Sequence, residues 1–249
     1  MTLEYSGVSY AEHASKNTCD EIWETLQAYF PHSAKHYSSM DVDEYRSLVG
    51  LAQDALCNRG FVRKIVREIY PQIVQALQES RFFIQTNLYL RATRPHVFQD
   101  GEAIGWHRES FYGSNMEHSF NIWTPIAGVV TENTLRFVPE SQNIPEDQIS
   151  TERLNDKVTL KYSIGHKIGF QYAPKRIVSG VDFSRTEPMN VPRYHSSIFP
   201  GNLIHGAAHN KSEQIRFSLD FRILPISAFN NFSSKNFHFA SGKPYFEEY

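Results

Sequence analysis

Three residues of this sequence have the chemistry and the spacing of ligands to one metal ion. His107 and Glu109 stand two positions apart, so on an extended segment their side chains point to the same side of the backbone. His205 follows much later and can complete the set from another strand. Two imidazoles and one carboxylate on one face of an octahedral ion are typical of a non-haem iron site, and they leave the opposite face open to other ligands. We therefore expect an iron centre at these three residues.

Short segments with strand propensity follow one another between positions 82 and 224, and we expect them to position the ligands. The first, 82–90, alternates between an apolar face (Ile84, Leu88, Leu90) and a polar face (Gln85, Asn87, Tyr89). Such alternation predicts a strand that lines a wet cavity. Further strands are expected at 117–125, 135–139, 158–162, 166–170, 194–199 and 214–224.

The first eighty residues have the periodicity of helices instead. Apolar side chains recur at helical spacing in 20–30, 43–56 and 61–77, and Pro71 is expected to kink the third helix. We expect these helices to pack on the outer face of a sheet. Many short strands after a helical lead-in favour a mainly β fold, a jelly roll or barrel with flanking helices.

The chain of 249 residues is long enough for one domain with a sizeable core, since 41% of its residues are apolar. We divide this domain, 1–249, into a helical lead-in (1–80), a jelly-roll core (82–224) that carries an insert (141–192), and a C-terminal extension (225–249). Within the insert, 141–156 and 171–192 have irregular composition. Loops of that length are either lids and substrate-binding segments or inert surface insertions.

Charge and cysteine content exclude several classes of function. The 25 basic and 27 acidic residues leave a net charge of -2 without a block of like charges, so nucleic acid and anionic membranes are not favoured partners. Cys19 and Cys57 fit neither a disulfide framework nor a zinc finger. The first residues lack a signal-peptide pattern, and the longest apolar stretch, 120–130, is interrupted by polar residues and proline. We expect a cytoplasmic protein.

The residues that follow His205 form a longer pattern. Gly206 comes next, then Asn210 and Ser212, and Arg216 stands eleven positions after the histidine. This segment resembles the distal motif of the phytanoyl-CoA dioxygenase family, a branch of the iron and 2-oxoglutarate dependent oxygenases. In that family the second histidine ligand is followed by Gly, by Asn-x-Ser and by an arginine at these positions. The resemblance covers about 82–224.

A second match lies between the two ligand segments. The stretch 121–125 resembles the family's tryptophan strand, and 132–141 resembles its Glu-Asn-Gly-x-Leu and Pro-Gly-Ser-His turn. Three positions depart from the family pattern, because Thr134 and Glu140 replace glycines and Gln142 replaces the histidine.

The resemblance implies a double-stranded β-helix that uses Fe(II), 2-oxoglutarate and O2. His107, Glu109 and His205 would ligate the iron, and Arg216 would pair with the distal carboxylate of 2-oxoglutarate. A guanidinium matches a carboxylate with two parallel bonds, which a lysine does not offer. Ser218 shares a strand face with Arg216 and could donate to the same carboxylate. Most family members have His-x-Asp, and the extra methylene of a glutamate changes reach rather than ligand chemistry.

Other polar and aromatic side chains are weaker candidates for the site. Those proposed to contact 2-oxoglutarate are Gln85 and Asn121, and those proposed to contact substrate are Asn87, Tyr89, Trp123 and Arg222. Ordinary interior roles fit each of them as well: a hydrogen-bonded amide, a core indole or a structural ion pair.

His209 competes with His205 for the role of distal ligand. It stands seven rather than eleven positions before Arg216, so His205 is preferred and His209 is expected in a loop near the site. The alternative to a metal site is that His107 and His205 are hydrogen-bonded core histidines and Glu109 is an exposed strand carboxylate. The combined spacing weighs against this alternative.

These features predict a dioxygenase that oxidises a C–H bond of a small molecule, with hydroxylation as the default outcome and succinate and CO2 as co-products. Desaturation, ring closure and epimerisation begin in the same way, and the sequence does not separate them. Basic residues in 141–192 suggest a polar or anionic metabolite. Two other classes share the fold and ligands: a jelly-roll protein that binds a metal or ligand without turnover, and a zinc-dependent hydrolase or isomerase. The oligomeric state is not predicted.

Overall fold

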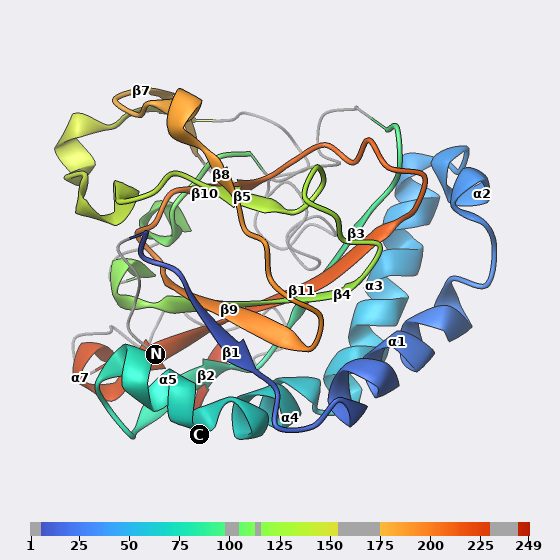
Figure 1. Ribbon diagram of the computed structural model, residues 1–249, viewed down its shortest axis with the longest axis horizontal. Helices are drawn as coiled ribbons and strands as arrows, with labels where there is room; N and C mark the ends of the chain where they lie inside the picture. Colours follow the sequence, from blue (N-terminus) through green and yellow to red (C-terminus); the bar gives the residue numbers. More distant parts are fainter. Residues whose placement is uncertain (1–5, 98–104, 113–115, 154–174, 230–243) are drawn as a thin grey trace.

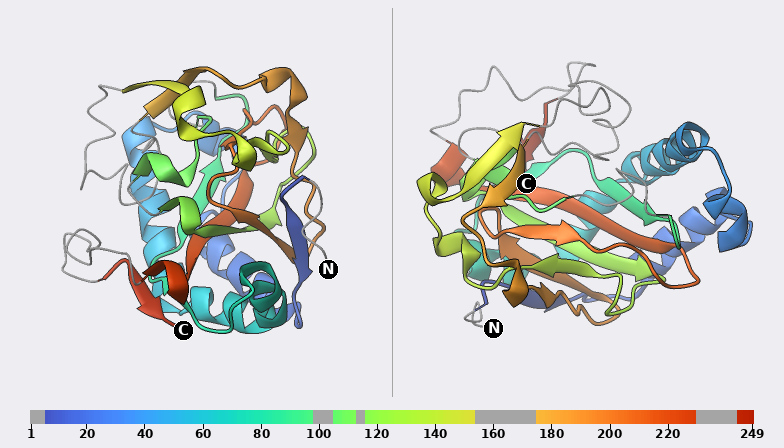
Figure 2. Two further views of the ribbon diagram at one scale, coloured as in Figure 1. Left: turned by 90° about the vertical axis from the view of Figure 1, so that its left-hand side faces the viewer. Right: turned by 90° about the horizontal axis from the view of Figure 1, so that it is seen from above.

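The computed structural model describes residues 6–97, 105–112, 116–153, 175–229 and 244–249 (Figures 1 and 2). Within these ranges the larger sheet has seven strands: β1 (Ser9–Glu12), β9 (His195–Pro200), β4 (Phe120–Ala127), β11 (Arg216–Pro225), β2 (Phe82–Gln85) and β12 (Phe246–Glu248) in this order, with β3 (Tyr89–Thr93) also paired to β11. All of these pairs are antiparallel.

A smaller antiparallel sheet faces the larger one. It consists of β10 (His205–Ala207), β5 (Leu135–Phe137) and β8 (Glu187–Pro188), in this order. The apolar cluster between the two sheets contains Trp123 of β4, Phe199 of β9 and Phe137 of β5. Two antiparallel sheets that share a core form a jelly roll, so the predicted fold class is confirmed.

Helices cover the outer face of the larger sheet, as predicted (Figure 1). They are α1 (Asn17–Tyr29), α2 (Ala34–Ser38), α3 (Val42–Asn58), α4 (Phe61–Glu68) and α5 (Tyr70–Leu77), and the short α7 (Ile226–Phe229) follows β11. The kinked helix expected over 61–77 is two helices that meet at Ile69. Pro71 has no N–H to donate to the preceding turn, so the chain ends one helix and begins another at this point. No helix among the described residues is long and apolar enough to cross a membrane.

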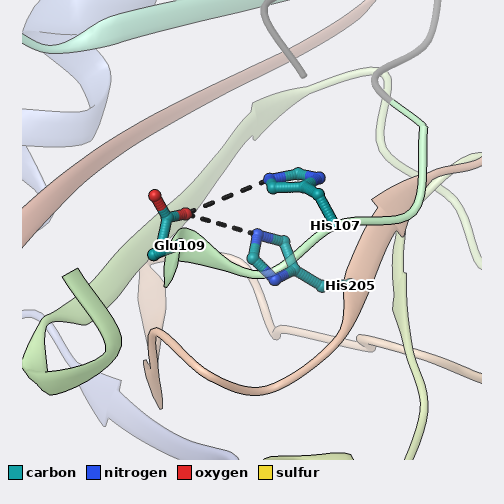
Figure 3. Close-up of side chains that lie close together, drawn as sticks. All are labelled: His107, Glu109 and His205. Carbon is teal, nitrogen blue, oxygen red and sulfur yellow. Dashed lines mark ion pairs between the residues drawn. The ribbon is translucent and has the colours of Figure 1, made fainter. Parts of the chain in front are cut away.

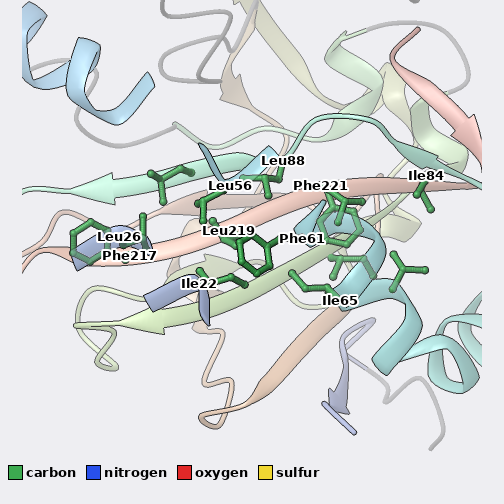
Figure 4. Packing of buried hydrophobic residues seen from close by; sticks show 14 of the residues in the cluster. Ile22, Leu26, Leu56, Phe61, Ile65, Ile84, Leu88, Phe217, Leu219 and Phe221 are labelled. Carbon is green, nitrogen blue, oxygen red and sulfur yellow. The ribbon is translucent and has the colours of Figure 1, made fainter. Parts of the chain in front are cut away.

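Strand β11 is shared by the core and the site. Its odd-numbered side chains, Phe217, Leu219 and Phe221, pack against α1, α3 and α4 through Ile22, Leu26, Leu56, Phe61 and Ile65 (Figure 4). Its even-numbered side chains, from Arg216 to Arg222, point to the opposite face, and all of them are buried. A two-residue period therefore places an apolar core on one side of the strand and a row of polar groups on the other.

Several elements differ from the sequence prediction. Strand β1 was not expected, and it pairs with β9 at the edge of the larger sheet. The single strand expected over 82–90 is broken into β2 and β3, which pair with different parts of β11. In the insert expected to be irregular, β6 (Ser150–Arg153) pairs with β7 (Lys175–Ser179). The strands expected at 158–162 and 166–170 lie outside the described residues.

The turn at Glu140 keeps a glycine-like conformation without a glycine. Glu140 has φ 63°, in the left-handed region, although its side chain makes this conformation unfavourable. The next residue, Ser141, accepts a hydrogen bond on its Oγ from the Ile204 N–H at 2.8 Å. The N–H of Val138 donates to the Ile204 carbonyl at 2.9 Å. The turn thereby fixes the residue that precedes His205.

Gly128 is a position where the backbone requires a glycine. It has φ 65°, and an added Cβ would lie 2.1 Å from the carbonyl oxygen of Ile215, directly before Arg216. Gly60 has a similar φ of 68° but open space around the added atom. We expect Gly60→Ala to cost about 1 kcal/mol of unfolding free energy, from left-handed strain alone, and Gly128→Ala to cost about 3 kcal/mol. Urea unfolding of both variants measures the difference, and equal losses would contradict the backbone clash.

Candidate active site

The two histidines are placed by backbone pairing between distant segments. His107 and His205 face each other in an antiparallel bridge, in which each N–H donates to the other's carbonyl at 3.0 Å. Glu109 does not continue this extended segment, as the sequence prediction assumed, but begins a short 3-10 helix, Glu109–Tyr112. Its N–H donates to the Gly201 carbonyl at 2.7 Å, which turns the chain back toward the histidines. The three side chains therefore meet by a turn rather than by strand alternation.

The ligand atoms of these residues face one another (Figure 3). Glu109 Oε1 lies 4.0 Å from His107 Nε2 and 3.7 Å from His205 Nε2, and the three side chains could hold a metal ion. All three residues are buried. Among the described residues they form the one group of histidine, cysteine and acidic side chains with this geometry. The structure thus brings together the ligands that the sequence predicts.

Both imidazoles are held in the form that binds a metal. His107 Nδ1 lies 2.7 Å from the Gly105 carbonyl, and His205 Nδ1 lies 2.9 Å from the Leu203 carbonyl. A carbonyl only accepts, so each Nδ1 carries the proton and each Nε2 presents a lone pair toward Glu109. Burial lowers the pKa of His205, and burial together with the neighbouring His205 lowers that of His107 well below its usual range. Neutral imidazoles are the state that ligates iron.

Arg216 lies on the polar face of β11 and is held by a neighbouring loop and by the end of β3. Its Nη1 donates to the Asn133 carbonyl at 2.7 Å, and its Nη2 donates to Thr93 Oγ1 at 2.8 Å. Asn133 is in turn joined to Asn210, since its Nδ2 donates to the Asn210 Oδ1 at 3.0 Å. These asparagines belong to the two sequence motifs that carry the family resemblance. Their role in the structure is to hold the segments around Arg216.

Three buried donors near this row have no partner among the described residues. They are Arg216 Nε, Ser218 Oγ and Asn121 Nδ2. A guanidinium has five N–H groups, and the two bonds above leave three of them for a ligand. Burial, with the nearby Arg91, lowers the pKa of Arg216 to about 10, so the group remains charged at neutral pH. Buried donors without partners are costly, and a carboxylate is the group that fits a cation beside a hydroxyl.

The other predicted site residues divide into two groups. Gln85 and Tyr89 lie on the polar face: Gln85 Oε1 accepts from the Arg222 N–H at 3.0 Å, and its Nε2 lies 3.4 Å from the Tyr89 hydroxyl. Trp123 is 2% exposed and packs in the core between the sheets. Arg222 is bound to Glu109 and Asp220, so protein carboxylates occupy its guanidinium.

Two residues lie away from the polar face. Asn87, proposed as a substrate contact, turns toward the helices, and its Oδ1 accepts from the thiol of Cys57 in α3 at 2.9 Å. The reason is the break between β2 and β3, which removes the strict alternation that the prediction assumed. His209 is exposed and lies outside the metal-binding group.

Sequence reasoning missed four residues of this region: Thr93, Arg91, Asp220 and Tyr112. Arg91 binds Asp220 with two bonds, from Nε and from Nη2, the second at 3.0 Å. Tyr112 lies beside the metal group, with its ring 5.5 Å from that of His107. The signal for the first three was alternation, because polar residues occupy every second position of 89–93 and of 216–222.

Fold and site together define a jelly-roll protein with a buried group of two histidines and one carboxylate and a buried arginine beside it. The profile of the phytanoyl-CoA dioxygenase family matches residues 9–218, and the chain belongs to this family. No match was found among curated protein sequences.

Solved structures of similar fold include a non-heme monooxygenase and an epimerase. EvdO2 from Micromonospora carbonacea var. aurantiaca, complexed with 2-oxoglutarate, has a TM-score of 0.55 at 14% identity, over 88% of this chain and 87% of its own. The epimerase SnoN, in complex with Fe3+, alpha ketoglutarate and nogalamycin RO, has 0.55 at 11%, over 97% and 92%. The non-heme monooxygenase ThoJ, in its apo form, has 0.54 at 13%, over 90% and 75%. At these identities the likeness concerns the fold.

Proposed function

We propose that this protein is an Fe(II)- and 2-oxoglutarate-dependent dioxygenase that oxidises a C–H bond of a small polar metabolite, most simply by hydroxylation. His107, Glu109 and His205 are the iron ligands, and Arg216 and Ser218 bind the distal carboxylate of 2-oxoglutarate. The observation that carries the proposal is a pair of buried donors, Arg216 Nε and Ser218 Oγ, that have no partner in the described part of the chain and lie on the strand that faces the metal group. A metal-binding protein without turnover, or a zinc hydrolase, does not need a keto-acid clamp at this position.

The protein residues have separate tasks in this scheme. The two imidazoles and the carboxylate hold one face of the ion, which leaves positions for the co-substrate and for O2. When bound, Fe(II) and 2-oxoglutarate supply the oxidising chemistry, with loss of CO2 and formation of succinate. Arg216 orients the co-substrate through two parallel bonds, Ser218 adds a third donor, and Asn121 Nδ2 offers a further one from the adjacent strand.

Hydroxylation is preferred over halogenation because Glu109 supplies a carboxylate at the third protein position of the site. A bound chloride would need that position, so no halogenated product is expected. The basic residues of the insert 141–192 favour a polar or anionic substrate. The solved relatives are described as a monooxygenase and an epimerase, so the final outcome on the substrate is a property to measure.

The experiment combines the protein with Fe(II), 2-oxoglutarate and isotopically labelled O2, and screens a metabolite library for substrate-stimulated succinate. We expect one labelled oxygen in succinate, label in a hydroxylated product and no dependence on added chloride. Chlorinated product would refute the role of Glu109. A protein that binds Fe(II) but forms no labelled succinate with any compound would favour the non-catalytic alternative. Metal analysis that finds zinc and hydrolysis without O2 would favour the zinc enzyme.

A further inference from the structure

The carboxylate of Glu109 is held in place by another side chain of the protein, that of Arg222. Arg222 Nε donates to Glu109 Oε2 at 3.0 Å, and Arg222 Nη2 donates to Glu109 Oε1 at 3.1 Å. The side chains are 1% and 9% exposed, so both charges are removed from water. Two parallel bonds between a planar guanidinium and a carboxylate fix the plane of the carboxylate as well as its position.

The two oxygens of Glu109 consequently have different surroundings. Oε1 faces the Nε2 atoms of both histidines, whereas Oε2 faces Arg222. A carboxylate oxygen has two lone pairs, so Oε1 can accept from Arg222 and still present a lone pair to the metal. The arrangement directs one oxygen of the carboxylate to the ion and retains the other on the protein.

Arg222 is itself fixed by a chain of alternating charges. Its Nη1 lies 3.4 Å from Asp220 Oδ2, and Asp220 receives the two bonds from Arg91. The ring of Tyr89 contacts both guanidiniums, with its centroid 5.1 Å from the Cζ of Arg222 and 5.2 Å from that of Arg91. Burial disfavours the charged form of Arg222, but Glu109 and Asp220 outweigh it and raise its pKa. The guanidinium is therefore a permanent charge with little freedom to turn away from Glu109.

The length of the ligand side chain fits this arrangement. Glu109 begins a 3-10 helix, and its carboxylate reaches both the histidine pair and Arg222 on β11. An aspartate would be shorter by one methylene from the same backbone position, so it could reach the ion only by releasing Arg222. The departure from the family's His-x-Asp pattern thus coincides with a specific partner on the opposite strand.

We propose that Arg222 is a positioning residue that holds Glu109 in its metal-binding orientation and makes the glutamate ligand dependent on it. The proposal rests on the proposed function in that it takes His107, Glu109 and His205 as the metal site. The interaction differs from a general charge effect because it needs the planar fork of arginine. It also differs from a structural ion pair because its loss changes the metal site of a protein that is still folded.

The test measures Co(II) binding to the full chain by calorimetry and by the visible spectrum of the bound ion, without turnover. Outer partners of metal ligands contribute about 10- to 100-fold to affinity, so we expect Arg222→Met to weaken binding about tenfold and to change the spectrum. Arg222→Lys keeps the charge but not the fork, and it should also lose affinity. Arg94→Met is the control, since Arg94 is also a buried arginine and donates to backbone carbonyls beside the helices.

A double-mutant cycle with Glu109→Asp tests whether the two substitutions have coupled or additive effects on Co(II) affinity. In the Glu109→Asp background we expect Arg222→Met to change the Co(II) affinity by less than about threefold, because the shared contact is already lost. Equal fold-changes in both backgrounds, or wild-type affinity and spectrum in Arg222→Lys, would overturn the proposal. If Arg222→Met does not fold, Arg222→Lys decides alone. A wild-type chain that binds no divalent ion would instead refute the proposed function.

Discussion

Replacing His205 by alanine should abolish stoichiometric Fe(II) binding and turnover. In the proposed site His205 supplies one of three ligand atoms, and its Nε2 lies 3.7 Å from Glu109 Oε1. Loss of an inner ligand is expected to exceed the 10- to 100-fold effects of outer partners, so the affinity should fall by more than about a hundredfold. Equilibrium dialysis with metal analysis measures the loss, and succinate formation reports turnover.

His209→Ala is the matched control for this prediction. His209 stands on the same segment and has the same side chain, but it is exposed and lies outside the metal-binding group. We expect the His209 variant to keep one Fe(II) per chain and wild-type turnover. The reverse pattern, with metal lost in His209→Ala and kept in His205→Ala, would transfer the distal ligand role to His209.

The three candidate ligands could be identified in the sequence by their residue types and spacing. The way in which the chain brings them together could not be predicted. Glu109 was expected on an extended segment, but the hydrogen bond from its N–H to Gly201 turns the chain into a 3-10 helix. That bond joins residues distant in sequence, and local pattern carries no record of it. His107 is likewise placed by a tertiary contact, because it pairs with His205 and belongs to no strand of its own.

The fold class followed from periodicity, whereas register did not. Alternation in 82–90 correctly placed Ile84 and Leu90 in the core and Gln85 on the polar face. It failed at Asn87 because the chain leaves β2 and re-enters the sheet as β3, against a different part of β11. Whether an extended segment remains one strand depends on the partner it pairs with, and this is a property of the tertiary structure.

The role of Arg222 could not be predicted from the sequence either, because it depends on tertiary contacts. A lone arginine on a polar strand face was compatible with an anionic substrate group or with an ion pair. Its partners, Glu109 and Asp220, come from a distant turn and from two positions earlier on the same strand. Only the three-dimensional placement of Glu109 distinguishes these interpretations, since alternation gives the face of a residue and not the group opposite to it.

Arg216→Leu should weaken the binding of 2-oxoglutarate by about 2 to 4 kcal/mol, or about 30- to 700-fold, because the buried carboxylate loses its charge partner. The substitution also leaves the Asn133 carbonyl and Thr93 Oγ1 without the donors they have now, so the variant's folding is checked by urea unfolding. Fe(II) affinity should stay near the wild-type value, since the contacts of Arg216 do not include the three ligands. Titration of the Fe(II) protein with 2-oxoglutarate under nitrogen, followed by calorimetry, gives the affinity.

Arg216→Lys distinguishes the planar fork from charge alone. Lysine keeps one positive charge but offers no pair of parallel donors, so we expect a loss between those of wild type and Arg216→Leu. Ser218→Ala should add a smaller loss of about 1 kcal/mol, since its hydroxyl is a neutral donor on the same face of β11. If Arg216→Leu binds 2-oxoglutarate as tightly as the wild type, the carboxylate is held elsewhere. The next cation on this strand face is Arg222, whose release from Glu109 would then have to accompany co-substrate binding and would appear as weaker binding in Arg222→Met.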